Sequence, residues 1–286
     1  MADKNRTILL ITLLLMAVFS AHASAASWAE LIYDAGVPPK TRENVGRAVN
    51  AVDEQLTQYQ ISLRYNIKIV VTADYDSFLK EWMRYGEMSR AEAEEGVKGS
   101  AGASVGNKPI ILIRGRSALN ENPEEAFRSL PHEIFHQLQS QGYGKTLVPW
   151  LTEGSADFFM LGVLDTAGFG KVNDFIHGAE DRICQAPAIP DVRELADYNY
   201  QSYTSLAQEG YPVYEMSAVM VARLVQDNGF EKIILFYHLL HKGTARDKAF
   251  LTAFRLPSAQ FLNEMNAYFA NLCNDRYRGK IGLREE

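Results

Sequence analysis

The sequence predicts an α+β protein with a small strand-containing N-terminal lobe and a larger, mainly helical C-terminal lobe. Two patterns carry this prediction. Residues 62–72 and 109–114 contain apolar, β-branched runs typical of strands, whereas apolar residues recur at helical spacing from Asn122 onward. We therefore expect an N-terminal α/β lobe at 26–121 and a helical lobe at 122–286.

The first 25 residues have the features of a secretory signal peptide. Two basic residues precede an apolar run of twelve residues at 8–19, interrupted by one threonine, and small residues follow up to Ala25. The run is too short for a membrane-spanning helix, which needs roughly 20 apolar residues. We expect cleavage after Ala23 or Ala25, which removes residues 1–25 and leaves a periplasmic or secreted chain, 26–286, without stable membrane insertion.

The charge balance argues against nucleic acid as the main partner. The whole chain has a formal net charge of −6, which becomes −7 without residues 1–25 because that segment holds two basic residues and one acidic residue. A mildly acidic chain is a poor match for a phosphate backbone but leaves peptide and protein partners open. Composition favours no particular oligomeric state.

The chain has two cysteines, Cys184 and Cys273. In an oxidising compartment we expect them to form one disulfide that ties a loop to the C-terminal helix. Two buried free thiols are the alternative. Because the two stand far apart in sequence, they lack the paired spacing of a cysteine zinc site.

Spacing of apolar and turn residues predicts the order of elements. A hairpin is expected at 99–114, with a Gly-rich edge strand as its first half and a flexible loop as the alternative for that half. Pro131 leaves open whether a helix begins there or bends there. Residues 165–209, rich in Gly, Pro, Asn and Tyr, are expected to form loops. Helices are predicted at 41–60, 76–84, from 122, from a Thr152 cap, and at 214–227, 230–241 and 259–274.

The segment His132-Glu133-Ile134-Phe135-His136 has the pattern H-E-x-x-H. Residues four apart share one face of a helix, so both imidazoles can reach one metal ion. Glu153 is the natural third ligand, since catalytic zinc takes three protein ligands and keeps one open position. Asp157, one helical turn later, is the alternative third ligand. The pattern predicts one Zn²⁺ per chain, held by His132, His136 and Glu153.

Glu133 lies beside the predicted metal face, within reach of a water molecule there. Zinc lowers the pKa of such a water from about 16 toward about 7. Glu133 would accept the proton of that water and later deliver it to a leaving amine. The expected chemistry is therefore peptide hydrolysis by Glu-assisted attack of a zinc-activated water.

H-E-x-x-H followed by Trp150-Leu-Thr-Glu-Gly-Ser-Ala-Asp157 resembles the gluzincin zinc metallopeptidases, the group that includes thermolysin and the zinc aminopeptidases. The pattern around Glu153 is especially similar to the peptidase-MA-like proteins of that group. The specific motifs cover residues 131–157, within a resemblance that runs from about Ile67 to the C-terminal helices. Metzincins fit less well, because Gln139 and Gly142 stand where that group has Gly and His.

The resemblance implies a zincin-like catalytic domain at 26–286 with the metal in a cleft between the lobes. It implies Glu153 as third ligand and Asp157 as the carboxylate that orients a zinc histidine, expected to be His132. It also implies an oxyanion donor from the helical lobe, for which Tyr214 is the first candidate and Tyr211 the second. The small residues after Glu153 should let that helix approach the metal helix closely.

Further consequences concern the substrate. An edge strand at 102–105 would bind an extended peptide through main-chain hydrogen bonds. His238 and His241, near a helix end, and His177 are read as structural rather than metal-binding. The chain lacks the acidic Met-Glu-Asn type signature of zinc aminopeptidases, which favours an endopeptidase.

The function expected from the sequence is thus a zinc-dependent peptidase acting on peptide or protein substrates. A rival interpretation is a catalytically silent, zincin-like scaffold that binds cell-envelope protein or peptidoglycan. In a third interpretation the histidines only pack within a helix.

Overall fold

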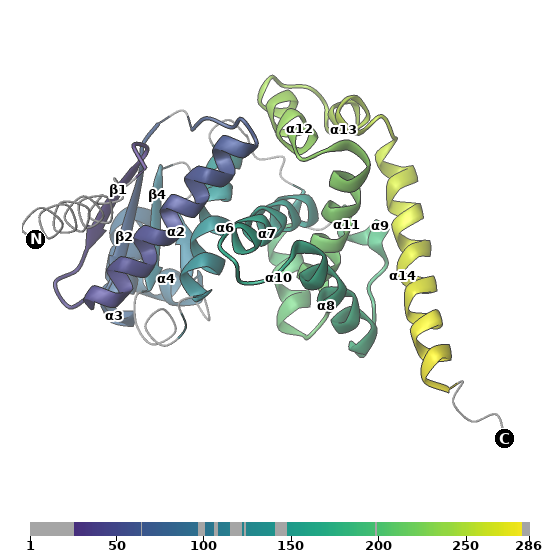
Figure 1. The fold of residues 1–286 in the computed structure, drawn as a ribbon, viewed down its shortest axis with the longest axis horizontal. Helices are drawn as coiled ribbons and strands as arrows, with labels where there is room; N and C mark the ends of the chain where they lie inside the picture. The colour runs from purple at the N-terminus through teal and green to yellow at the C-terminus, as the bar shows by residue number, and fades with distance from the viewer. Residues whose placement is uncertain are drawn as a thin grey trace, which may run out of the picture.

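A computed structural model shows a mostly helical protein with one small sheet near the N-terminal end of the described chain (Figure 1). The predicted α+β class is confirmed. The predicted signal peptide lies outside the described residues, and none of the described helices combines the length and the apolar character needed to cross a membrane. The structure describes residues 26–63, 65–96, 101–105, 108–114, 122, 124–140, 148–197 and 199–281.

The sheet has four strands in the order β1-β2-β4-β3. The first three are parallel, and β3 runs antiparallel to β4 at one edge. The predicted hairpin strands are thus β3 and β4, with β3 at the edge, while β1 was not predicted. The strands are β1 (Ala29–Tyr33), β2 (Ile67–Thr72), β3 (Gly102–Ser104) and β4 (Ile110–Arg114).

Helices cover both faces of the sheet because successive strand residues point to opposite sides. Ile69 of β2 and Ile111 of β4 belong to the main core with α2 and α6, whereas Val70 and Leu112 pack with α3 and α4. The main core continues through α6 into the helical part without a break. The covering helices are α2 (Pro39–Gln58), α3 (Tyr75–Gly86), α4 (Arg90–Gly96) and α6 (Glu124–Ser140).

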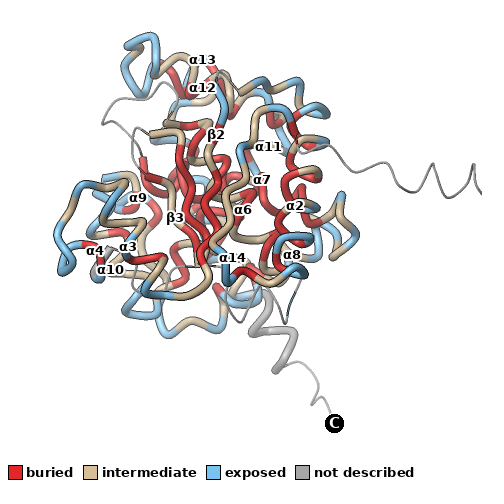
Figure 2. Tube along the Cα trace, turned by 90° about the vertical axis from the view of Figure 1, so that its left-hand side faces the viewer, coloured by how far each residue is buried: buried red, intermediate tan, exposed pale blue. Residues whose placement is uncertain are grey.

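The helical part is built around α7, which is apolar and buried on nearly every side (Figure 2). It packs against α6 and α11. A Cβ on Gly154 would lie 2.3 Å from the carbonyl oxygen of Ser217, so glycine permits the contact with α11. The helices are α7 (Pro149–Thr166), α8 (Val172–Gln185), α9 (Val192–Leu195), α10 (Tyr200–Gln208), α11 (Val213–Asn228), α12 (Glu231–His241), α13 (Arg246–Phe254) and α14 (Ser258–Ile281).

Several local predictions were wrong. Helix α7 begins at Pro149 rather than at a Thr152 cap, because Pro is favoured at the first helical position. Of the small residues after Glu153, Ser155 contacts Gln139 of the metal helix α6 as expected, whereas Gly154 contacts α11. The segment 165–209 contains α8, α9 and α10, since buried Ala179 and Ile183 follow helical spacing despite the turn-forming residues around them.

Helix α6, which carries both histidines, does not begin at Pro131. It runs from Glu124 to Ser140 with Pro131 inside, and the side chain of Asn122 accepts a hydrogen bond from the Glu124 amide at 3.1 Å. His132 and His136 therefore lie in the second half of one helix that starts well before Pro131.

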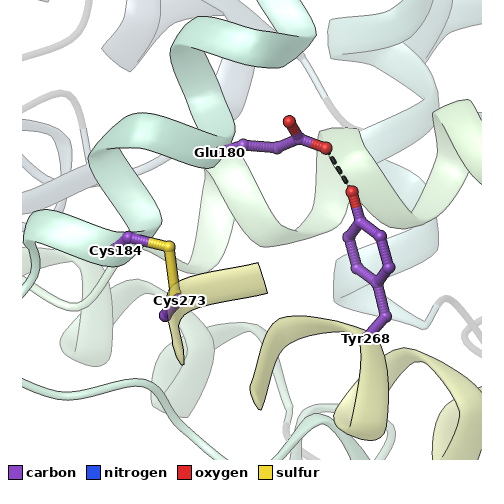
Figure 3. Close-up of a disulfide and its surroundings, with 4 residues drawn as sticks. All are labelled: Glu180, Cys184, Tyr268 and Cys273. Atoms are coloured by element: carbon purple, nitrogen blue, oxygen red, sulfur yellow. Dashed lines mark hydrogen bonds between the residues drawn. A yellow bond between two sulfur atoms is a disulfide. The ribbon is translucent and has the colours of Figure 1, made fainter. Parts of the chain in front are cut away.

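The C-terminal helix is fastened to α8 by two contacts (Figure 3). Cys184 and Cys273 form a disulfide with their Cα atoms 5.1 Å apart, and Cys184 lies on a helix rather than in the predicted loop. One helical turn away, the hydroxyl of Tyr268 donates to the buried carboxylate of Glu180. This carboxylate also lies 3.1 Å from Nδ1 of His177.

Replacing both cysteines by serine should destabilise the fold without unfolding it. The disulfide joins positions 89 residues apart, and such a cross-link contributes about 2–4 kcal/mol, largely by restricting the unfolded chain. For a protein of this size that corresponds to a Tm lower by roughly 5–15 °C. Calorimetry of the double variant and of reduced wild type measures it; an unchanged Tm in both would contradict the assignment.

Candidate metal centre

Helices α6 and α7 bring three potential ligand atoms together. Nε2 of His132 lies 2.9 Å from Nε2 of His136, and Oε2 of Glu153 lies 3.3 and 3.6 Å from these two nitrogens. Within the described part of the chain, this is the group of histidine, cysteine and carboxylate side chains that could hold a metal ion. His238 and His241 belong to no such group there.

Hydrogen bonds of the two Nδ1 atoms determine which nitrogen of each imidazole faces the candidate metal site. Nδ1 of His132 is 2.8 Å from a carboxylate oxygen of Asp157, and Nδ1 of His136 is 2.8 Å from Oε1 of Gln139. Both partners are acceptors, so each Nδ1 carries a hydrogen and leaves Nε2 free to bind a metal. Asp157 therefore lies behind His132, and Glu153 rather than Asp157 faces both imidazoles.

Gln139 was not identified from the sequence as a site residue, yet it links three helices behind the site. It is 2 % exposed, and its amide nitrogen lies within 3.1 Å of the Thr152 carbonyl, the Ser155 hydroxyl and the Tyr237 hydroxyl. These contacts assign the amide nitrogen, so Oε1 must be the atom that accepts from His136. Its position three residues after His136, on the same helical face, was the available signal.

The second carboxylate oxygen of Glu153 bonds to a tyrosine that the sequence did not indicate. The Glu153 side chain is almost fully buried, and its Oε1 accepts a hydrogen bond from the Tyr200 hydroxyl at 2.7 Å. Tyr200 is the first residue of α10, in the segment predicted as loop. Burial and the nearby Glu153 charge raise the pKa of Tyr200 far above its usual value, so its hydroxyl stays protonated.

The charges of the three ligand groups depend on one another. Burial opposes the imidazolium of His132, but hydrogen bonds and charges of Asp157 and Glu153 outweigh it and raise the pKa. Burial also opposes charge on His136, whose pKa the Glu153 carboxylate raises. The pKa of Glu153 falls well below its usual value because the imidazoles outweigh burial. Positive charge between these atoms comes from protons or from a metal ion, which therefore compete.

Glu133 lies between the metal-binding face and the edge of the sheet. Its main-chain carbonyl accepts a hydrogen bond from the Ser104 hydroxyl at 3.0 Å, and that hydroxyl accepts one from Gln137 at 3.1 Å. A Cβ on Gly102 would lie 3.3 Å from Cγ of Glu133. Strand β3 is thus packed directly against the predicted catalytic glutamate.

The outer edge of β3 presents main-chain groups beside Glu133. Ala101 and Val105 bond to β4 at 2.9 and 3.0 Å. In an antiparallel pair such bonding alternates along the strand, so the amides and carbonyls of Gly102 and Ser104 point to the other edge. In the described sheet that edge has no neighbouring strand.

Tyr214 lies in the second position of α11, and its ring packs edge-on against Tyr203 at 5.2 Å. Burial and the charges of Glu153, Asp157 and Glu133 raise its pKa. Its hydroxyl has no hydrogen-bond partner among the described side chains and backbone, in contrast to Tyr200. Tyr211, just before α11, packs partly buried against the core.

A cavity of about 320 Å³ opens beside Asp157 and Tyr214. It lies between α6, α7, α8 and α11. Its lining combines buried apolar residues, Met160, Leu161 and Ala218, with charged ones, which include Arg128 and Glu215.

Comparison of the chain with protein-family models, curated proteins and solved structures gives no match. The functional conclusion therefore depends on the geometry of the site itself.

Replacing Gln139 by leucine should weaken metal binding. It removes the acceptor that orients His136, and loss of such a contact behind a ligand costs about 10–100-fold in metal affinity. Titration with Co²⁺, followed by absorption spectroscopy, measures the effect.

Gln137→Leu is the matched control. Gln137 is equally buried on the same helix, but its amide bonds to Ser104 and to the Ile110 carbonyl. This variant should lose stability and keep its Co²⁺ affinity. Equal affinities for wild type, Gln137→Leu and Gln139→Leu would contradict the role assigned to Gln139.

Proposed function

We propose that this protein is a zinc-dependent peptidase that cleaves internal peptide bonds. One arrangement supports the proposal. The ligand atoms of His132, His136 and Glu153 converge near Glu133, whose charge acts on His136. Strand β3, whose outer edge has no neighbour in the described sheet, packs against the same glutamate.

Zinc is the metal that fits this set of donors best. Ligands about 2.0–2.1 Å from a tetrahedral zinc are roughly 3.3 Å apart. The three donor separations here are 2.9, 3.3 and 3.6 Å. Two imidazoles and one carboxylate leave one of four positions open, the composition of a catalytic rather than a structural zinc site.

With a metal bound at this site, the residues around it would have separate roles in peptide hydrolysis. A bound zinc would lower the pKa of water to about 7 and polarise the scissile carbonyl. Glu133 would take the proton from the attacking water and return it to the leaving amine. Tyr214, whose raised pKa keeps the phenol protonated, would donate a hydrogen bond to the oxyanion as it develops.

The surroundings favour an extended peptide as the substrate. The outward amides and carbonyls of Gly102 and Ser104 can pair with a peptide main chain, as an exposed sheet edge does in other complexes. The cavity beside Asp157 and Tyr214, which has both apolar and charged lining residues, can receive one substrate side chain. Cleavage within the chain is favoured because the sequence lacks the acidic aminopeptidase signature.

The proposal includes action in the periplasm or outside the cell. The disulfide between Cys184 and Cys273 supports an oxidising compartment, because such bonds are rare in reducing cytosol. The basic and apolar pattern of residues 1–25 supports export.

Glu133→Gln should retain about one zinc per chain and lose peptide hydrolysis. The amide keeps the size of the side chain but cannot take a proton, and general-base catalysis contributes about 10²–10⁴-fold. Elemental analysis of purified protein gives the zinc content, and mass spectrometry of a digested peptide library gives the activity. Glu125→Gln, a change on the same helix outside the ligand group, is the control and should remain active.

The outcomes separate the proposed peptidase from its rivals. Chelator-sensitive cleavage that persists in Glu133→Gln would contradict the role of Glu133. Zinc-loaded wild type that cleaves no library peptide would favour a binding scaffold. Protein purified without chelator and free of metal would favour histidines that only pack.

A further inference from the structure

The two oxygens of Glu153 have different partners. Oε2 lies 3.3 Å from Nε2 of His132 and 3.6 Å from Nε2 of His136, whereas Oε1 accepts the hydroxyl of Tyr200 at 2.7 Å. Carboxylates bind cations through one oxygen or through both. Because a strong hydrogen bond holds Oε1, only Oε2 is directed at the histidine nitrogens.

Tyr200 is held firmly enough to act on this carboxylate. The side chain of Asn199 accepts the Ser202 amide at 2.9 Å and starts α10 immediately before the tyrosine. One turn later, the fully buried Tyr203 donates to the Val213 carbonyl at 3.0 Å, which ties α10 to α11. The position of the Tyr200 hydroxyl is therefore set by the packing of its helix.

We propose that Tyr200 is a positioning residue that restricts Glu153 to one-oxygen ligation and so keeps the fourth metal position open. The inference rests on the proposed metal site and adds a residue that the H-E-x-x-H pattern does not contain. A Glu153 side chain without this hydrogen bond can turn Oε1 toward the metal. The second oxygen would then occupy the position that water and substrate need.

The contact between Tyr200 and Glu153 joins a partly exposed residue to a buried carboxylate. Tyr200 as a whole is 38 % exposed, whereas Glu153 is 5 % exposed. Removing only the hydroxyl therefore changes the contact with Glu153 and leaves the ring in place.

Tyr200→Phe in the full folded chain tests the proposal, with Co²⁺ as the probe. In wild type, Co²⁺ should give the intense visible absorption of a four-coordinate site. In Tyr200→Phe the absorption should weaken toward that of a five-coordinate site. With zinc, kcat should fall about 10–100-fold, the range for groups behind a ligand, while KM stays nearly constant.

Thr204→Val is the matched control. Thr204 donates to the Tyr200 carbonyl at 2.9 Å, so this variant loses a hydroxyl from the same helix without touching Glu153. Its Co²⁺ spectrum and kcat should match wild type. Identical Co²⁺ spectra in wild type and Tyr200→Phe would overturn the proposal, as would an equal spectral change in Thr204→Val.

The spectral readout keeps this inference distinct from the proposed peptidase. If wild type binds Co²⁺ but cleaves no peptide, the peptidase proposal fails and the spectrum of Tyr200→Phe still decides the role of Tyr200. If wild type binds no Co²⁺, the role of Tyr200 is overturned together with the metal site.

Discussion

The burial of the Glu153 carboxylate between α6 and α7 is the constraint on which the rest of the site depends. An isolated charge in such a place is strongly unfavourable unless it is paired and hydrogen-bonded. Here His132 and His136 face Oε2 of Glu153, and Tyr200 donates to Oε1. These contacts offset the free-energy cost of burying the carboxylate. They also direct one oxygen of Glu153 and one nitrogen of each histidine at a common position.

The scaffold maintains that position from three directions. Gln139 joins α6 to α7 and α12 through a fully buried amide, and Ser104 and Gln137 join α6 to the edge of the sheet. Gly154 allows α7 to lie against α11 at a distance that any side chain would prevent. The disulfide acts elsewhere, on α8 and α14, so it stabilises the fold without contacting the site.

Local periodicity predicted the parts of the site that lie on one helix. His132 and His136 share a face by spacing alone, and the strands of the hairpin followed from their apolar and turn residues. Tyr200 could not be found this way, because its contact with Glu153 spans 47 positions and depends on how α10 packs. The same applies to α8, whose helix is stabilised by burial against α7 and α11 despite unfavourable local composition. Gln139 was within reach of helical spacing, yet its role depends on partners from two other helices.

X-ray absorption at the zinc edge of the metal-loaded protein identifies the atoms bound to the metal. We expect two imidazole nitrogens and two oxygens, one from Glu153 and one from water, at about 2.0–2.1 Å. The imidazole contribution should halve in His132→Ala. A shell that contains sulfur, or one whose imidazole contribution is the same in wild type and His132→Ala, would contradict this expectation.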